Sequence, residues 1–292
     1  MATPKISRRD LLKKAGVAGS AAAATQLGAG APVEAQTAPL PRRWDREADI
    51  VIIGSGATGM PAAIVAREAG SSVIVIEATR DIGGHAICSG ANIPLGGGTS
   101  VQKKHGIEDS PDLVFKDLTD WSVTQPNGHA DYRHNDREII RAFADNCART
   151  FEFLLAHGVT FVNDKPDGRA GSSHGNSVPR QMHVWAGDWP QVQTGVPTPQ
   201  DVRATTSNGN GLMRPLEEAA RTIGVEFLLE HRMTALHRER PQSGRVLGVG
   251  VTANGRALDI RARKAVIIAT GGSTGNVNFR RMFDPRLTEE YC

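Results

Sequence analysis

The residues whose type and spacing most clearly indicate a chemical function are three glycines in one short segment, 49–59. This segment has the pattern of a buried strand, a tight turn and the first turn of a helix, which is the layout that a dinucleotide pyrophosphate requires. Gly54 permits the tight turn, Gly56 lets the backbone approach the phosphates without a Cβ, and Gly59 lets the helix pack close to the strand. We therefore predict that the phosphates contact Gly54, Ser55, Gly56, Ala57, Thr58 and Gly59.

An acidic residue follows at the distance that this interpretation requires. A helical stretch over 62–69 leads to a second apolar strand over 72–76, and Glu77 ends that strand eighteen positions after Gly59. A carboxylate there can accept hydrogen bonds from both adenosine ribose hydroxyls and would repel a 2′-phosphate. Glu77 and its neighbour Ala78 join the predicted site. A chance glycine turn is the alternative, and the order of strand, turn, helix, strand and acid argues against it.

Two further glycine-bearing segments could reach the same ligand. The stretch 78–92 is rich in small residues and holds the pair Gly83-Gly84, which suggests backbone lying against a flat ligand, although a plain flexible loop has the same composition. Near the other end of the sequence, the apolar strand 265–272 stops at Gly271-Gly272. A buried strand that ends in two glycines lets a second piece of backbone approach the ligand.

The elements around these segments predict an α/β fold with a central parallel sheet. The expected helices lie at about 111–122, 136–155 and 212–222, and the expected short strands at 225–229, 234–237, 246–252 and 258–262. Asn254-Gly255 is a strong two-residue hairpin signal, so the late strands should form a β-meander. The helix over 136–155 has an apolar face that includes Ile139, Phe143 and Cys147, and Cys147 is predicted to be a core thiol.

The stretch 163–209 has the composition of a loop. Its segment Gly171–Gly175 matches the Gly-x-Ser-x-Gly nucleophile elbow of hydrolases, with Ser173 as the nucleophile, but no strand precedes it and no helix follows it. Four other residues could line a pocket, with packed or solvated loop residues as the alternative: His183, Trp185, Asp188 and Trp189.

Charge and composition narrow the classes of function. With 39% hydrophobic and 22% charged residues, the chain is predicted to be soluble and globular. The surplus of three positive charges resides in residues 1–35, so the remainder is neutral and predicts no nucleic-acid partner. The cysteines Cys88, Cys147 and Cys292 form no disulfide framework, no Cys-x-x-Cys pair and no haem motif, and no metal site is predicted.

Residues 1–35 resemble a twin-arginine export signal. The segment 7–13, which contains Arg8-Arg9, precedes a weakly apolar run at 15–24 and a small-residue exit at Val33-Glu34-Ala35. The run is too short and too rich in glycine for a transmembrane span, and a disordered basic tail is the alternative. We therefore expect a periplasmic or exported protein that uses the twin-arginine machinery, with a linker over 36–47.

The glycine segment at 54–59, Glu77, Gly83-Gly84, the late strands and the segment 269–272 together resemble the fumarate reductase/succinate dehydrogenase flavoprotein superfamily, in its soluble flavocytochrome-like branch. The resemblance covers about residues 48–280 and implies FAD rather than NAD, in a Rossmann-like FAD-binding domain over 48–278. In this family the counterpart of 83–92 runs beside the isoalloxazine, the Ala-Thr-Gly-Gly strand returns to the cofactor, and backbone near Thr234 flanks the adenine. The cofactor residues so implied are Gly83, Gly84, His85, Ser89, Gly90, Ala91, Asn92, Thr234, Ala269, Thr270, Gly271 and Gly272.

His85 raises the question of a covalent flavin. In the membrane-bound succinate dehydrogenase branch, a histidine at this place is bonded covalently to the flavin, whereas the soluble branch usually has a polar residue there and holds FAD noncovalently. Gly83-Gly84 follows the soluble pattern, so the resemblance favours a noncovalent flavin beside His85, with the covalent bond as the alternative. Cys88 in the same loop is expected to pack, with a reactive thiol as the alternative.

The resemblance also implies an activity. Members of the family continue into a capping domain that carries the substrate-binding and proton-donating residues, so we expect 279–292 to be the start of a truncated capping domain and assign no catalytic residue. The implied activity is hydride transfer between flavin N5 and an activated carbon–carbon double bond of a carboxylate or ketosteroid-type substrate, with electrons from a separate partner. The alternatives are an inactive FAD-binding remnant, a pyridine-nucleotide dehydrogenase and the hydrolase based on Ser173.

Overall fold

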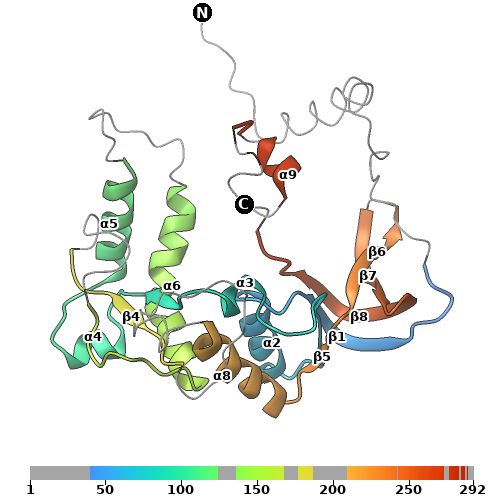
Figure 1. Cartoon of the computed structure of the whole chain (residues 1–292), viewed down its shortest axis with the longest axis horizontal. Helices are drawn as coiled ribbons and strands as arrows, with labels where there is room; N and C mark the ends of the chain where they lie inside the picture. Colours follow the sequence, from blue (N-terminus) through green and yellow to red (C-terminus); the bar gives the residue numbers. More distant parts are fainter. Residues whose placement is uncertain are drawn as a thin grey trace, which may run out of the picture.

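The structure is a computed structural model that describes residues 40–123, 136–167, 177–186, 209–241, 243–272, 276–282, 284–286 and 288, the side chains of 120–123 excepted. Within this part of the chain a six-stranded sheet has the order β5-β2-β1-β8-β7-β6 (Figure 1). Its strands span Arg46–Ile53 (β1), Val73–Ile76 (β2), Glu226–Leu228 (β5), Arg232–Arg240 (β6), Ser243–Ala253 (β7) and Arg256–Ile268 (β8). The predicted α/β fold is confirmed.

The sheet has a parallel half and an antiparallel half. Strands β5, β2, β1 and β8 run parallel, and β8, β7 and β6 form the predicted meander. The two strands expected at 258–262 and 265–272 are one strand, because β8 pairs with β7 near its start and with β1 as far as Ile268. Asn254 and Gly255 have φ angles of 49° and 75°, as the predicted two-residue turn requires.

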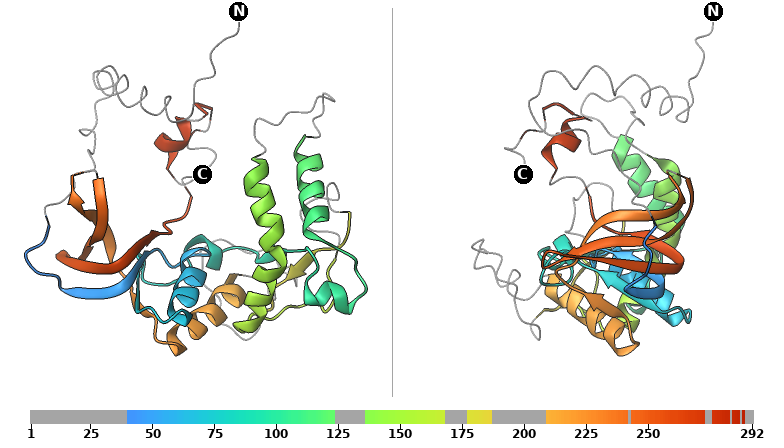
Figure 2. Two further views of the ribbon diagram at one scale, coloured as in Figure 1. Left: turned by 180° about the vertical axis from the view of Figure 1, so that it is seen from behind. Right: turned by 90° about the vertical axis from the view of Figure 1, so that its right-hand side faces the viewer.

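Apolar residues lie on both faces of the central strands, where they form two separate clusters. Ile52 of β1 packs in a cluster with Ile64 and Met213, which belong to the helices α2 (Gly59–Glu68) and α8 (Gly209–Thr222). Val51 points to the other face, where it shares a cluster with Val249 and other residues of the meander. Figure 2 shows the helices α2 and α8 together on one face of the sheet.

The helices α5 (Pro111–Val123) and α6 (Arg137–Ala156) form a hairpin beside this body (Figure 1). Cys147 is buried between them, as predicted, and burial raises its pKa to about 11. The predicted apolar face of α6 is wrong in its first half, because Ile139 and Phe143 are exposed by 67% and 43%. The guanidinium of Arg141 stacks on the Phe115 ring of α5 at 4.2 Å, so a different side of the helix faces its neighbour there.

The remaining described elements are short: α3 (Gly84–Ile87), β3 (Asn92–Pro94), α4 (Ser100–Lys104), β4 (Gln181–His183) and α9 (Val277–Arg281). The expectation that 163–209 holds no regular element is wrong at β4, which pairs antiparallel with β3. Buried Arg180 anchors β4, because its guanidinium donates to Asp109 at 2.8 Å and to Asp117 at 2.6 Å. Strand β1 begins at Arg46, inside the stretch 36–47 that was expected to be linker.

None of the described helices is long and apolar enough to cross a membrane. The proposed export segment at 1–35 lies outside the described residues, as do Ser173, Asp188 and Trp189.

Candidate cofactor site

The first and last glycine-bearing segments meet at the carboxyl ends of β1 and β8. The Ala269 N–H donates to the Ile53 carbonyl at 2.8 Å, and the Gly54 N–H donates to the Ile76 carbonyl at 2.7 Å. A Cβ on Gly54 would lie 2.4 Å from the Ala269 carbonyl oxygen, and the φ of Gly54 is +98°, so only glycine allows this approach. The carboxyl edge of a parallel sheet, where the chain turns in opposite directions from adjacent strands, is the usual ligand crevice of such folds.

Gly59 and Gly56 are glycines for different reasons. A Cβ on Gly59 would come within 1.9 Å of the Gly54 carbonyl oxygen, so glycine there is needed for packing of the helix on the turn. A Cβ on Gly56 would meet only the Gly83 carbonyl oxygen among the described residues, at an ordinary 3.7 Å. Packing within the protein therefore does not require glycine at 56, and the space beside it suits a ligand phosphate.

The N-terminus of α2 supports the same interpretation. Thr58 is the N-cap residue, yet its side chain makes no capping hydrogen bond to the helix. Ala57 and Thr58 are exposed beside Gly56, so the helix N-terminus is open to an anion. The residues present thus fit a dinucleotide pyrophosphate at 54–59.

The second glycine segment lies against the first. The Gly56 Cα is 3.9 Å from the place where a Cβ on Gly84 would stand, and Gly83 is buried with a φ of +97°. At the third segment, Cβ atoms on Gly271 and Gly272 would meet nothing within 4 Å among the described residues, and Thr270 is exposed. The structure therefore brings the three predicted segments to one edge of the sheet.

Glu77 is buried at the tip of β2 and accepts four hydrogen bonds. Ser55 donates to its Oε2 from the backbone at 3.0 Å and from the hydroxyl at 2.7 Å, and Thr79 donates to Oε1 from the backbone at 3.0 Å and the hydroxyl at 2.9 Å. Burial alone would raise the pKa of Glu77, but these donors favour the charged form more strongly and lower the pKa below 4.5. The carboxylate is thus ionised at neutral pH and tied to the phosphate loop.

The connection between β5 and β6 lies beside Glu77. The His231 N–H donates to the Glu77 carbonyl and the Glu230 N–H to the Thr79 carbonyl, both at 2.9 Å. Thr234, three residues after His231, is exposed near the start of β6, and its hydroxyl donates to the Gly250 carbonyl at 3.2 Å. The contacts of Thr79 and His231 with Glu77 were not predicted from the sequence. The position of Thr79, two residues after the acid, could have indicated a hydroxyl donor to the carboxylate.

The stretch 85–92 is not a plain loop. His85 is exposed on the short helix α3, and Ser89, Gly90 and Asn92 are also exposed, whereas Ala91 is buried. Asn92 contacts His183 on β4, since the Asn92 Oδ1 lies 2.9 Å from the His183 Nδ1. The sequence had left open whether His183 lines a pocket or is an ordinary loop residue. Contact of these residues with the flavin stays a prediction.

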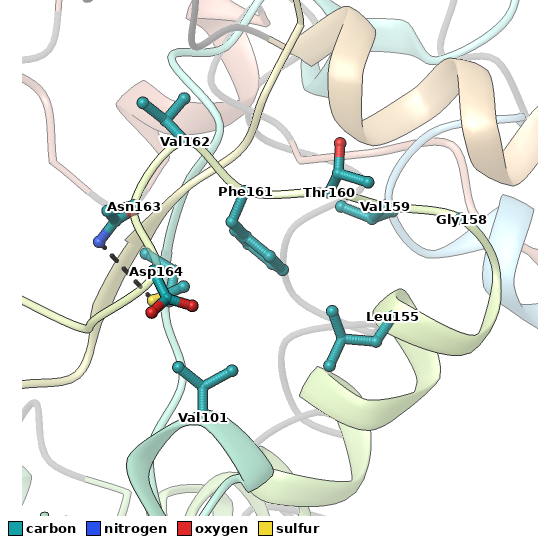
Figure 3. A pocket seen from close by; sticks show the side chains of 10 residues that line it. Val101, Leu155, Gly158, Val159, Thr160, Phe161, Val162, Asn163 and Asp164 are labelled. Carbon is teal, nitrogen blue, oxygen red and sulfur yellow. Dashed lines mark hydrogen bonds between the residues drawn. The ribbon is translucent and has the colours of Figure 1, made fainter. Parts of the chain in front are cut away.

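A separate pocket of about 430 Å³ lies away from these segments, between α4, the end of α6 and residues 158–164. Figure 3 shows Phe161, Leu155 and Val101 on different sides of this pocket. Its polar side chains are engaged nearby, since Asp164 pairs with Lys104 at 2.7 Å and Asn163 donates to the Lys165 carbonyl at 2.8 Å. None of the predicted cofactor residues lines it, and of the predicted pocket residues neither His183 nor Trp185 does.

No group of three or more His, Cys, Asp or Glu residues that could hold a metal ion is present in the described ranges. The meeting of the three glycine-bearing segments is the geometry of an α/β protein that binds a dinucleotide at the edge of a parallel sheet.

Comparison with known proteins gives the family. The chain belongs to the family described as FAD binding domain, whose model matches residues 49–292, and its cofactor is FAD. The structure is similar to 3-ketosteroid-delta4-(5alpha)-dehydrogenase from Rhodococcus jostii, with a TM-score of 0.66 and 27% identity over 84% of this chain and 50% of that one. It shares the fold of the open form of a flavocytochrome c3 fumarate reductase, with a TM-score of 0.65, 21% identity, and coverage of 98% of this chain and 40% of that one.

Characterised relatives by sequence are reductases and dehydrogenases. The acrylate reductase flavoprotein subunit of Shewanella woodyi is 27% identical over 85% of this chain and 44% of its own length. Urocanate reductase of Eggerthella lenta is 28% identical, over 86% and 36%. The 3-oxosteroid 1-dehydrogenase of Mycolicibacterium smegmatis is 27% identical, over 80% and 48%. The chain thus spans about half or less of the length of these relatives, and the part that it shares with them includes the FAD-binding domain.

Proposed function

We propose that this chain is the FAD-binding part of an oxidoreductase that acts on an activated carbon–carbon double bond. The observation that carries the proposal is the meeting of three glycine-bearing segments at one sheet edge, with space beside Gly56 that no described residue fills. The names of the relatives support it: acrylate and urocanate each carry a carbon–carbon double bond beside a carboxylate, and a 3-oxosteroid 1-dehydrogenase removes hydrogen near a carbonyl, the reverse type of reaction. When bound, FAD supplies hydride chemistry at the flavin N5.

The chain's own contribution is binding and orientation. The N-terminus of α2 and the backbone of 54–59 hold the pyrophosphate, and the ionised Glu77 holds the adenosine ribose. The segments 83–92 and 269–272 would border the flavin when FAD is bound. We assign no catalytic side chain among the described residues.

We further propose that electrons reach the flavin from a separate protein and that the protein is exported. A relative is named a flavoprotein subunit, which supports a separate electron-donating protein, and Arg8-Arg9 supports twin-arginine export. Substitution of both arginines by lysine, R8K together with R9K, should retain the protein in the cytoplasm. Export of this variant at the normal rate would refute the proposed signal.

Turnover of the FAD-loaded chain tests the proposed reaction. A reduced viologen dye serves as the electron donor, and dye oxidation is followed after addition of acrylate, fumarate or urocanate; for a 3-oxosteroid, reduction of an oxidised dye is followed instead. The FAD-free chain and reactions without substrate are the controls. Substrate-dependent dye turnover with one of these compounds would support the proposed reaction and show that this chain itself suffices for it. Tight FAD binding without turnover on any of them would instead show that the chain is a flavin-binding part only.

A further inference from the structure

Ser55, between the first two glycines, has a side chain that links two other segments of the cofactor site. It is fully buried, its hydroxyl lies 2.7 Å from Oε2 of Glu77, and the Gly83 N–H lies 3.0 Å from the same hydroxyl oxygen. The Ser55 N–H also donates to Oε2, at 3.0 Å. One small side chain therefore touches the phosphate loop, the acidic residue and the second glycine segment.

The chemistry of its neighbours determines the direction of each hydrogen bond. The ionised carboxylate of Glu77 can only accept, and the backbone N–H of Gly83 can only donate. The Ser55 hydroxyl must therefore donate its one proton to Glu77 and accept from Gly83. Oε2 of Glu77 consequently accepts two hydrogen bonds, and both come from Ser55.

The other carboxylate oxygen is not bound so firmly. Oε1 accepts from the N–H and from the hydroxyl of Thr79, but this hydroxyl also lies 2.7 Å from the Asp81 carbonyl oxygen. A hydroxyl has a single proton, so Thr79 can donate to only one of these two oxygens. When Thr79 donates to the Asp81 carbonyl, Oε1 keeps one donor and becomes free to accept a hydroxyl from a ligand. Thr79 is exposed and can change partner, whereas Ser55 is enclosed.

We propose that Ser55 is a positioning residue of the FAD site, which links Glu77 to Gly83 through one hydroxyl and leaves only Oε1 of Glu77 to bind the adenosine ribose. The inference rests on the FAD site proposed above. It assigns different functions to the two oxygens of one carboxylate: Oε2 holds the loop, and Oε1 holds the ligand. It also couples the adenosine end of the site to Gly83-Gly84, which borders the flavin end.

The test compares Ser55→Ala with Thr79→Val in the full 292-residue chain. Each variant removes one hydroxyl that donates to Glu77, but only Ser55→Ala also leaves the Gly83 N–H without its acceptor. Dissociation constants for FAD and for ADP, which carries the adenosine ribose without a flavin, are measured by flavin fluorescence and by competition. Circular dichroism of the ligand-free proteins checks that both variants fold.

Ser55→Ala is expected to weaken FAD by at least about tenfold, in keeping with loss of a hydrogen bond to a charged group, and to weaken ADP as well. Thr79→Val should stay within about threefold of the wild type for both ligands, because Thr79 leaves Oε1 when the ligand binds. A pH series separates positioning from simple loss of structure. Loss of the Ser55 donor raises the pKa of Glu77, so Glu77 becomes protonated at a higher pH. When the pH is lowered, FAD should therefore dissociate from Ser55→Ala at a higher pH than from the wild type.

The possible failures are distinguishable. If the wild-type chain binds neither FAD nor ADP, the proposed site itself is wrong. If the wild type binds FAD and Ser55→Ala binds it equally well with the same pH dependence, only the role of Ser55 is refuted. Equal losses in Ser55→Ala and Thr79→Val would refute the division between the two oxygens. Should Ser55→Ala not fold, Ser55→Cys keeps the side-chain size with a weaker donor and is judged by the same comparison.

Discussion

Replacement of Gly56 by alanine separates ligand binding from folding. The new Cβ would have only the Gly83 carbonyl oxygen within 4 Å among the described residues, at 3.7 Å, and Gly56 is not in the left-handed region of φ. The ligand-free protein should therefore keep its stability or gain about 0.4–1 kcal/mol, because alanine restricts the unfolded chain more than glycine does. The same methyl group would occupy the space that the pyrophosphate needs. Its cost in the complex is that of overpacking, about 1–3 kcal/mol, or roughly 5–150-fold in Kd for FAD.

Gly59→Ala is the matched control for this experiment. Its Cβ would stand 1.9 Å from the Gly54 carbonyl oxygen and 3.2 Å from the Ala269 Cβ, so the ligand-free protein must shift its backbone. We expect a loss of at least about 1–3 kcal/mol in the free energy of unfolding of this variant. The assays are urea unfolding without FAD and flavin fluorescence titration with FAD.

The two ligand-free variants should differ in their stability to urea. Gly56→Ala should unfold at the wild-type urea concentration or above and bind FAD weakly, whereas Gly59→Ala should unfold earlier. Wild-type affinity in Gly56→Ala would show that no phosphate lies beside that residue. Equal destabilisation of both ligand-free variants would show that the distances at these glycines do not describe the folded protein.

Three further predictions concern stability. The folded protein lowers the pKa of Glu77 from 4.5 and that of Asp109 from 3.8, so both carboxylates stabilise the fold in their charged form. This stabilisation should be complete above the ordinary pKa values of 4.5 and 3.8 and should be lost as the pH falls below them. A Tm that drops already between about pH 7 and 6 would contradict this. Arg180→Met leaves the buried carboxylate of Asp109 without its cationic partner and should cost about 3–5 kcal/mol in urea unfolding. A loss below about 1 kcal/mol would refute the stabilising role of the Arg180–Asp109 ion pair. Phe151→Ala should cost about 3–5 kcal/mol and Phe143→Ala much less, since their exposed fractions are 0% and 43%; equal losses would mean that Phe143 is covered.

Local signals predicted the parts of the fold that short-range chemistry determines. The strand before Gly54, the helix after it, the hairpin at Asn254-Gly255 and the helix that Asp136 caps each depend on neighbouring residues, and each has the predicted form. The convergence of the three glycine segments could also be predicted, because carboxyl ends of parallel strands share one edge.

Features that depend on distant partners were not predictable in this way. Strand β4 forms because β3 lies beside it and because Arg180 reaches Asp109, which is 71 positions away in the sequence. The exposure of Phe143 depends on which side of α6 faces α5, and periodicity cannot show that. The buried partners of Ser55 were hidden for the same reason, since Glu77 and Gly83 follow it by 22 and 28 positions.

The most direct test of the account is the flavin content of the purified chain. The protein is incubated with FAD, freed of unbound ligand by gel filtration, and precipitated with acid, after which the supernatant and the pellet are analysed for flavin. We predict FAD and protein in equal molar amounts, with all yellow colour in the supernatant, as a noncovalent flavin beside His85 requires. Colour in the pellet would establish a covalent bond and overturn the noncovalent prediction. A colourless protein that retains no FAD but binds NADH tightly would contradict the assignment of this chain as a flavoprotein.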